Sequence, residues 1–234
     1  MTEDQFLQEV TKLGIALTTE QQNKLNKFYQ LLIEWNEKIN LTTIIKKEEV
    51  YLKHFYDSLT LVKAINFNQV NSLIDIGSGA GFPGIVLKIV FPHLDIVLLD
   101  ALQKRVNYLN TIIKELELKN IIAIHSRAEE YAVSHREEFD LVTARAVAAL
   151  PILTEICAPF VKVGGFFLPM KGNVDIELKN SFQAFQELSL KLKRTVTFSL
   201  PVEESSRTIL MLEKIAPTPL KYPRATDKIK KRPL

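Results

Sequence analysis

The chain has 234 residues, of which 47% are hydrophobic and 24% charged, and its formal net charge is +3. This composition is that of a globular protein and excludes a disordered or collagen-like chain. Apolar runs end well before the roughly 18 residues that a membrane-spanning helix needs. With no signal peptide expected, we predict a cytoplasmic protein without a membrane partner. A single cysteine, Cys157, and four scattered histidines indicate neither a disulfide nor a metal site.

The N-terminal residues 1–66 predict a helical cap. Thr18 or Thr19, followed by Glu20, resembles a helix start, and the helix is expected to end between Asn36 and Asn40. Apolar residues then recur at three- and four-residue spacing, which indicates one buried face: Leu25, Phe28, Leu31, Leu32 and Trp35. From Glu48 a second stripe of the same kind predicts another helix: Val50, Leu52, Phe55, Leu59 and Val62.

Residues 67–217 alternate between strand and helix patterns. Strands are predicted at 73–76, 96–99, 121–124, 141–143 and 166–169. Helices are predicted at 85–90, 103–118, 129–135, 150–161 and 175–192. This alternation favours a parallel sheet with right-handed crossovers. Two further strands, 195–199 and 208–213, are separated by too few residues for a helical crossover, so we expect them to be antiparallel.

The stretch Ser72–Gly84, SLIDIGSGAGFPG, holds four of the eight glycines. Glycine is favoured where the backbone needs a positive φ or must approach a ligand closely. From Gly79, the stretch satisfies the dinucleotide fingerprint G-x-G-x-x-G, with Asp100 about 20 residues further on. From Asp75, it resembles the first motif of S-adenosylmethionine-dependent methyltransferases. A lone G-x-G-x-x-G is weak evidence for a dinucleotide site, so other features of the sequence must decide between the two interpretations.

Three features favour the methyltransferase: the position of Asp75 before Gly77, the closing antiparallel pair, and Gly164-Gly165 before the fifth strand. Five parallel strands with an antiparallel closing pair match the mixed seven-stranded sheet of the α/β, Rossmann-like class I methyltransferases. In that class Asp100 would bind the ribose hydroxyls of S-adenosylmethionine. The loop Arg127–Glu129 would reach the adenine. The alternative for Asp75 and Asp100 is a cap or turn residue.

Several segments resemble the RsmG (GidB) family, the bacterial 16S rRNA guanine-N7 methyltransferases. They are WNEKINLT, HFYDSL, DIGSGAGFPGI, LLDALQKRVNYL, HSRAEEY, FDLVTARAV, GGFFLPMKG and YPRATDKIKKRPL, which run collinearly from about residue 31 to residue 234. The resemblance implies S-adenosylmethionine as donor and a guanine of 16S rRNA, free or in the small ribosomal subunit or its assembly intermediate, as acceptor. With the family's cofactor positions, the predicted cofactor set is Asp75, Gly77, Gly79, Gly81, Phe82, Asp100, Ala128, Glu129 and Arg145. One departure is ATDKI after YPR, where the family usually has a segment with Gly or Pro.

The residues after the fourth strand bear on the acceptor. An Asn/Asp-Pro-Pro-aromatic motif often marks methylation of an exocyclic amine, but here the chain reads Thr143-Ala144-Arg145-Ala146. A ring nitrogen such as guanine N7 carries no proton, so its methylation needs positioning and no general base. We predict Arg145 as the catalytic residue, bound to the guanine O6 edge or to a phosphate. The alternative is an ion pair with Asp75 or Glu129.

Basic residues predict the RNA contacts. The candidates are Lys104, Arg105, Lys171, Arg207, Arg224 and Lys228. The tail, residues 218–234, carries six basic groups and one acidic group, and is either solvated and mobile or a contact for a polyanion. Phe82 is expected to be exposed in the glycine turn, against the cofactor or a base. His54 and Asp57 form either a structural pair or part of the RNA cleft.

We expect a monomeric methyltransferase of the EC 2.1.1 class. Two other functions compete with this one. A nicotinamide (NAD) oxidoreductase is supported only by GAGFPG and Asp100, and no His or Tyr/Lys proton donor stands out. A non-catalytic RNA-binding ribosome-assembly factor is supported by the basic tail.

Overall fold

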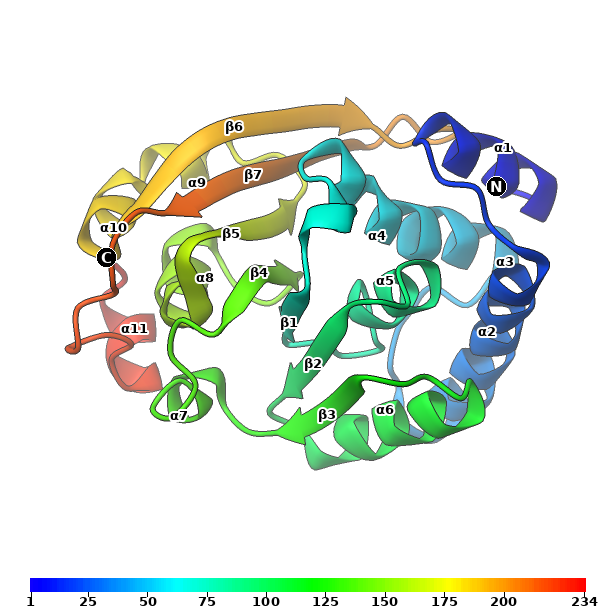
Figure 1. The fold of residues 1–234 in the computed structure, drawn as a ribbon, viewed down its shortest axis with the longest axis horizontal. Coiled ribbons are helices and arrows are strands. Elements are labelled where there is room, and N and C mark those ends of the chain that lie inside the picture. The colour runs from blue at the N-terminus through cyan, green and yellow to red at the C-terminus, as the bar shows by residue number, and fades with distance from the viewer.

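A seven-stranded sheet with the order β3-β2-β1-β4-β5-β7-β6 runs through the computed structural model, which describes residues 1–234 (Figure 1). The first five strands are parallel, and β7 is antiparallel to both of its neighbours, β5 and β6. The predicted five parallel strands and antiparallel pair are therefore confirmed. Their bounds are β1 Ser72–Ile76, β2 Asp95–Asp100, β3 Ile121–His125, β4 Phe139–Arg145, β5 Val161–Lys171, β6 Leu190–Ser199 and β7 Ser206–Lys214.

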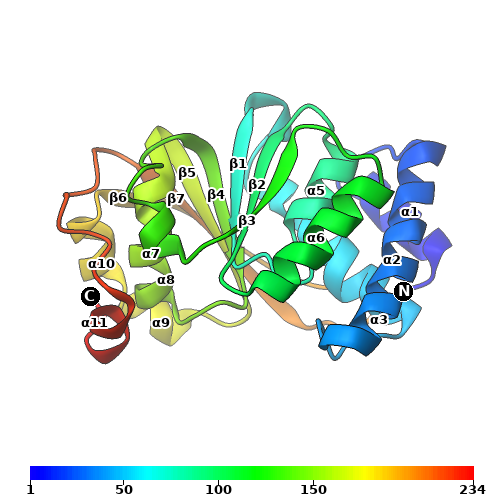
Figure 2. The same ribbon diagram turned by 90° about the horizontal axis from the view of Figure 1, so that it is seen from below.

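Helices cover both faces of the sheet, and the two ends of the chain lie on opposite sides of it (Figure 2). One face carries α1 Glu3–Lys12, α2 Thr19–Ile39, α3 Lys47–Val50, α4 Asp57–Leu59, α5 Gly84–Val90 and α6 Gln103–Glu115. The other carries α7 Ala128–Tyr131, α8 Leu150–Cys157, α9 Asp175–Lys179, α10 Phe182–Glu187 and α11 Thr226–Lys231. No helix is both long and apolar enough to cross a membrane.

The long helix α2 begins and ends where the sequence predicts. Thr18 accepts a hydrogen bond from the Gln21 backbone N–H, and the Gln21 side chain accepts one from the Thr18 N–H, which forms a capping box. The C-cap is Asn40 in the left-handed region, with φ 49°. The buried face of α2 holds Leu25 and Phe28, as its periodicity predicts.

The segment after Glu48 is helical, but it is not the single α-helix that we predicted. A π-helical turn, Tyr51–Tyr56, lies between α3 and α4, and a 3₁₀ turn, Thr60–Lys63, follows. π-helical turns are rare and occur mostly at functional sites. An apolar spacing of three and four residues does not reveal such a turn, because it inserts a residue without ending the helix.

The predicted helix 175–192 is also wrong in its extent. It breaks into α9 and α10 at Ser181, whose hydroxyl donates to the carbonyl oxygen of Glu177, and β6 already begins at Leu190. Serine competes for backbone hydrogen bonds in this way and disfavours a helix interior. Other helices end earlier than predicted: α6 stops at Glu115, α7 at Tyr131 and α8 at Cys157.

The core consists of two hydrophobic clusters, one on each face of the sheet. The larger cluster joins the N-terminal helices to the sheet, and in it the ring of Phe28 lies 5.6 Å from Phe55 and 5.2 Å from Phe82. Cys157 lies fully buried in the smaller cluster. The division into a cap (1–66), a central domain (67–217) and a tail (218–234) stays a prediction, although cap and sheet share one core.

Candidate functional site

The turn after β1, residues 77–84, folds back toward the end of β2. Gly77, Gly79 and Gly81 all have positive φ, which explains their residue type. The Gly79 N–H donates to Asp100 Oδ2 over 2.9 Å, and Asp100 Oδ1 accepts from the Leu102 N–H, also at 2.9 Å. The Asp100 carboxylate therefore stabilises the glycine turn, which is the role of a turn residue named as the alternative, and its contact with a ribose stays a prediction.

Asp75 lies beneath the turn at the end of β1 and is fully buried. Its Oδ2 accepts a hydrogen bond from the Gly84 N–H at 3.0 Å, whereas Oδ1 has no partner. Burial raises the pKa of Asp75 to about 7, because the charged form loses its hydration. Gly84 is required here, since a Cβ at this position would lie 2.9 Å from the Asp75 carboxylate.

A cavity of about 210 Å³, which we name the glycine pocket, opens beside this turn. The structure brings the predicted Gly77 and the predicted loop Arg127–Glu129 together in its wall, whereas the other residues of the predicted cofactor set do not line it: Asp75, Gly79, Gly81, Phe82, Asp100 and Arg145. Sequence reasoning missed ten further lining residues, which come from β1, β2, the loops after β2, β3 and β4, α8 and α11: Ile76, Leu99, Ala101, Ser126, Val147, Ala148, Ile152, Ile156, Thr226 and Lys230. Several of them, such as Val147, Thr226 and Lys230, fall in segments that resemble the family, but only the tertiary structure shows that they line one cavity.

One observation indicates that the glycine pocket is built for a ligand. Glu129 Oε1 is buried without a hydrogen bond, and Arg127 Nη1 lies 3.7 Å from it, beyond hydrogen-bond distance. A Cβ on Gly77 would lie 2.7 Å from Val147 Cγ2, so glycine is needed for the turn to pack against the loop after β4 in the wall of the pocket. An unpartnered buried carboxylate oxygen is costly, and a ligand that donates to it would remove the cost.

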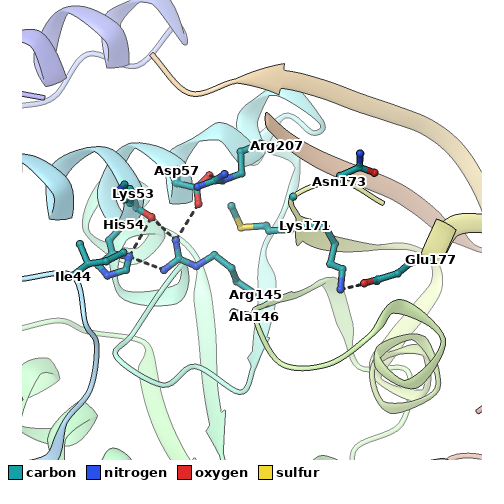
Figure 3. A pocket seen from close by; sticks show the side chains of 12 residues that line it. Ile44, Lys53, His54, Asp57, Arg145, Ala146, Lys171, Asn173, Glu177 and Arg207 are labelled. Atoms are coloured by element: carbon teal, nitrogen blue, oxygen red, sulfur yellow. Dashed lines mark hydrogen bonds and ion pairs between the residues drawn. The ribbon is translucent and has the colours of Figure 1, made fainter. Parts of the chain in front are cut away.

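A second cavity, of about 440 Å³, lies at the same edge of the sheet, and we name it the arginine cleft (Figure 3). Four basic side chains and two acidic ones line it, so it is positively charged. Its charged and polar side chains come from the π-helical turn, α4, β4, β5, β7 and the segment before α10: Lys53, His54, Asp57, Arg145, Lys171, Asn173, Glu177 and Arg207.

Arg145, at the end of β4, points toward the π-helical turn (Figure 3). Its Nη1 donates to the carbonyl oxygen of Lys53 at 2.8 Å and to Asp57 Oδ2 at 3.2 Å, and its Nη2 donates to His54 Nδ1 at 3.2 Å. The predicted alternative is an ion pair with a nearby carboxylate, for which Asp75 and Glu129 are the examples. Arg145 does form an ion pair, but its partner is Asp57, whose position 88 residues away no local pattern reveals.

Asp57 is the centre of this cluster and is only 3% exposed. One of its oxygens accepts from Arg145 and the other from Arg207 Nε, at 3.1 Å. The two guanidinium groups offset the cost of burying the Asp57 carboxylate, and the carboxylate in turn holds both arginines in place. His54 does not bond Asp57 directly; both contact Arg145, so the pair is part of the cleft.

Phe82 differs from its prediction. The sequence predicts an exposed ring, but Phe82 is 4% exposed and is stacked on His54 at 4.4 Å, with the Arg145 guanidinium 5.3 Å from the ring centroid. The ring belongs to the aromatic cluster with Phe28 and Phe55, because α2 and the π-helical turn cover the glycine turn. The ring therefore packs against Arg145 and His54 and is not free to stack on a base.

His54 is neutral in this setting. Burial and the neighbouring Arg145 lower the pKa of His54 to about 3. Its Nδ1 lies 3.2 Å from Arg145 Nη2 and 3.1 Å from the carbonyl oxygen of Lys53, and its Nε2 lies 3.1 Å from the Thr42 hydroxyl. A neutral imidazole at this point adds no charge to the cleft and accepts one N–H of Arg145.

The basic residues predicted to contact RNA fall into two groups. Four have acidic partners: Arg105 with Asp100, Lys171 with Glu177, Arg207 with Asp57 and Arg224 with Glu155. Lys104 and Lys228 are exposed and form no ion pair. Lys171 and Arg207 line the arginine cleft, whereas Arg224 stabilises the tail; the RNA contacts of all six stay predictions.

The strand order, the glycine turn after β1 and an acidic residue at the end of β2 define a class I methyltransferase, a class whose methyl donor is S-adenosylmethionine. A methyltransferase from Aquifex aeolicus has a TM-score of 0.55 and 14% identity, over 77% of this chain and 97% of that one. A precorrin-6y C5,15-methyltransferase from Geobacter metallireducens has a TM-score of 0.51 and 15% identity, over 75% and 92%. At these identities the likeness shows the fold alone.

The chain belongs to the GidB family, rRNA small subunit methyltransferase G, whose match spans residues 21–208. A protein of that name from Lysinibacillus sphaericus is 45% identical over 237 residues, covering all of both chains. Another, from Macrococcus caseolyticus, is 48% identical over 236 residues, covering 100% of this chain and 99% of its own. The predicted family is therefore confirmed.

Proposed function

We propose that this chain transfers the methyl group of S-adenosylmethionine to N7 of a guanine in the 16S rRNA of the small ribosomal subunit. Family membership supports an rRNA substrate, and the class I fold supports the donor. The observation that carries the proposal is the pairing of the glycine pocket with a positively charged cleft at one edge of the sheet. A polyanionic acceptor is expected to bind such a cleft.

The residues of the glycine pocket fit S-adenosylmethionine. Asp100, next to the lining residues Leu99 and Ala101, supports the glycine turn and is the residue that we assign to the ribose, and the buried Glu129 oxygen, which accepts no hydrogen bond within the chain, can accept one from the donor. Because Gly77 has no Cβ, the main chain of the glycine turn can come close to a bound ligand. When bound, the donor supplies an electrophilic methyl group on a sulfonium, and the chain has to place an acceptor nitrogen in line with it.

Arg145 is the residue that we assign to acceptor positioning. Three of its five N–H donors are used by Lys53, His54 and Asp57, which leaves two for the O6 edge of a guanine or for a phosphate. Because its partners are buried, the guanidinium holds a fixed orientation before the substrate arrives. The remaining basic groups of the arginine cleft would contact the backbone of the RNA.

The absence of a strong base near Arg145 agrees with a ring-nitrogen acceptor. Guanine N7 presents a lone pair and loses no proton on methylation, so the step requires alignment at about 3 Å and no proton acceptor. The pKa of His54 is lowered to about 3 by burial and by Arg145, which makes the imidazole a weak base, and the carboxylates of Asp57 and Glu177 are engaged in ion pairs. A step that needed a general base would require another group here.

The test is methyl incorporation into rRNA. Small ribosomal subunits from cells that lack this protein would be incubated with the chain and tritiated S-adenosylmethionine. The modified base would be mapped by reverse transcription after borohydride and aniline treatment, which cleaves at N7-methylguanine. We expect one strong stop in 16S rRNA. Label on another base, or rRNA binding without label, would overturn the proposal in favour of a different methylase or a non-catalytic assembly factor.

Two further measurements determine which rRNA particle is the substrate and whether the protein is a monomer. We propose that the chain acts as a cytoplasmic monomer on the subunit or its assembly intermediate. Incorporation into naked 16S rRNA, mature subunits and precursor particles would be compared at equal concentration. Light scattering should give the monomer mass of 26.7 kDa.

A further inference from the structure

The tail helix α11 lies against the glycine pocket. Thr226 and Lys230 line this cavity together with Ala128 and Glu129. Residues four apart share one face of a helix, and Ile229 on the same side is 1% exposed. Lys228 points to the opposite side of the helix because it lies two positions from each of them. The tail is therefore packed, contrary to the alternative of a mobile segment.

Buried hydrogen bonds hold the tail in this place. Arg224 donates from Nε and Nη2 to the two oxygens of Glu155, at 2.8 and 2.6 Å, and its backbone N–H donates to the same carboxylate at 2.9 Å. Glu155 lies fully buried in α8. Arg136 binds the carbonyl oxygens of Thr218 and Tyr222 at 2.8 and 2.7 Å. A bidentate pair with a buried carboxylate fixes position and orientation together.

The charges of the glycine pocket leave one cation without a partner. Arg127 lies 3.7 Å from Glu129, the one acidic residue of the lining, and Lys230 forms no ion pair. An ammonium donates up to three hydrogen bonds, and it faces a cavity whose other walls are largely apolar. Ring nitrogens and ribose hydroxyl oxygens of an adenosine are acceptors of the required kind.

We propose that α11 forms part of the donor-binding surface, with Thr226 and Lys230 in contact with the adenosine portion of S-adenosylmethionine. This inference rests on the proposed function, because it takes the glycine pocket as the donor site. In this proposal the two faces of α11 have different roles: Lys230 contacts the donor, whereas Lys228 faces outward and is available to bind RNA.

A thiol-protection experiment tests the contact without an activity assay. Cys157 is buried, so Lys230→Cys and Lys228→Cys each introduce one accessible thiol on opposite faces of the same helix. Each full-length variant would be reacted with a chromogenic disulfide reagent with and without saturating S-adenosylhomocysteine. We expect the ligand to slow the reaction about tenfold or more at position 230 and less than twofold at position 228. Equal rates with and without ligand at position 230 would overturn the proposal.

Calorimetric titration gives a second readout. Lys230→Ala should weaken S-adenosylhomocysteine binding about fivefold or more, whereas Lys228→Ala should leave it within twofold, with equal Tm values for the two free proteins. Equal affinities would overturn the contact of Lys230. Titration of the unsubstituted chain separates the two proposals: binding there with no effect at position 230 removes only this inference, and no binding there removes the donor site and the proposed function with it.

Discussion

The glycine pocket and the arginine cleft lie at one edge of the sheet but are constructed differently. The predicted part of the pocket comes from short stretches that directly follow β1 and β3, where turn residues and backbone groups form the wall. The cleft joins charged side chains from segments far apart in the chain, and Asp57 and Arg207 are 150 positions apart. The predicted wall of the pocket is thus determined by local backbone geometry, whereas the cleft depends on ion pairs between distant segments.

This difference predicts that substitutions in the two cavities impair different steps, methyl transfer and donor binding. Changes in the cleft should reduce methyl transfer while leaving the donor bound, and changes in the pocket should weaken donor binding first. A variant that lowers both equally would show that the two cavities act as one site.

Arg145→Ala should have the largest effect. Methyl transfer to small subunits is expected to fall about a hundredfold or more, a few kcal/mol of transition-state positioning, while S-adenosylhomocysteine binding stays within about tenfold. Single-turnover methylation and calorimetry measure the two quantities. The matched control is Arg194→Ala, since Arg194 also donates to carbonyl oxygens of the N-terminal helices, at Lys63 and Ala64, but lies outside the cleft. Turnover at the unsubstituted rate would remove Arg145 from the mechanism.

Gly77→Ala should weaken donor binding about tenfold. The residue has φ +70°, and its new Cβ would lie 2.7 Å from Val147 Cγ2. Gly164→Ala is the control, because Gly164 also has a positive φ, of +86°, but a Cβ there meets no atom within 4 Å. Both variants should lose about 1 kcal/mol of stability from backbone strain, and only Gly77→Ala should lose donor affinity in calorimetry. Equal donor affinity in the two would contradict a pocket shaped by this glycine.

Asp75→Asn should change the pH dependence of stability. Burial raises the pKa of the folded-state carboxyl to about 7, above its ordinary value of 3.8, so the folded chain binds an additional proton between these values. The stabilisation from that proton is complete below pH 4 and is lost as the pH rises through 7. The unsubstituted chain should therefore lose a few degrees of Tm from this group between pH 5 and pH 8, and Asp75→Asn should lose less. Parallel Tm curves over this range would contradict the raised pKa.

Lys104→Ala should have the smallest effect. Lys104 is exposed near the start of α6, at the edge of the sheet that carries both cavities, and it forms no ion pair. A lost phosphate contact should weaken RNA binding a few-fold and reduce the slope of log affinity against log salt by about 0.7. Lys114→Ala, at the other end of the same helix, is the control. An unchanged slope would exclude Lys104 from the RNA surface.

Much of the fold was predictable because it is encoded locally. Alternating apolar runs marked all seven strands, and the capping box at Thr18 marked the start of α2. The pattern failed at the π-helical turn Tyr51–Tyr56 and at the break near Ser181, where a helix changes without losing its apolar spacing. The sequence also did not predict that β7 inserts between β5 and β6, because pairing order depends on contacts across the whole sheet.

The sequence by itself determined the class I sheet, the glycine turn and the family, because strand periodicity, turn chemistry and motif spacing are properties of short stretches. Only the tertiary structure decided that Phe82 is buried, that Asp57 joins Arg145 to Arg207, and that α11 lies on the glycine pocket. Each of these depends on which distant segments meet. The sequence shows which residues are charged, but tertiary contacts between distant segments decide which of them pair when they are buried.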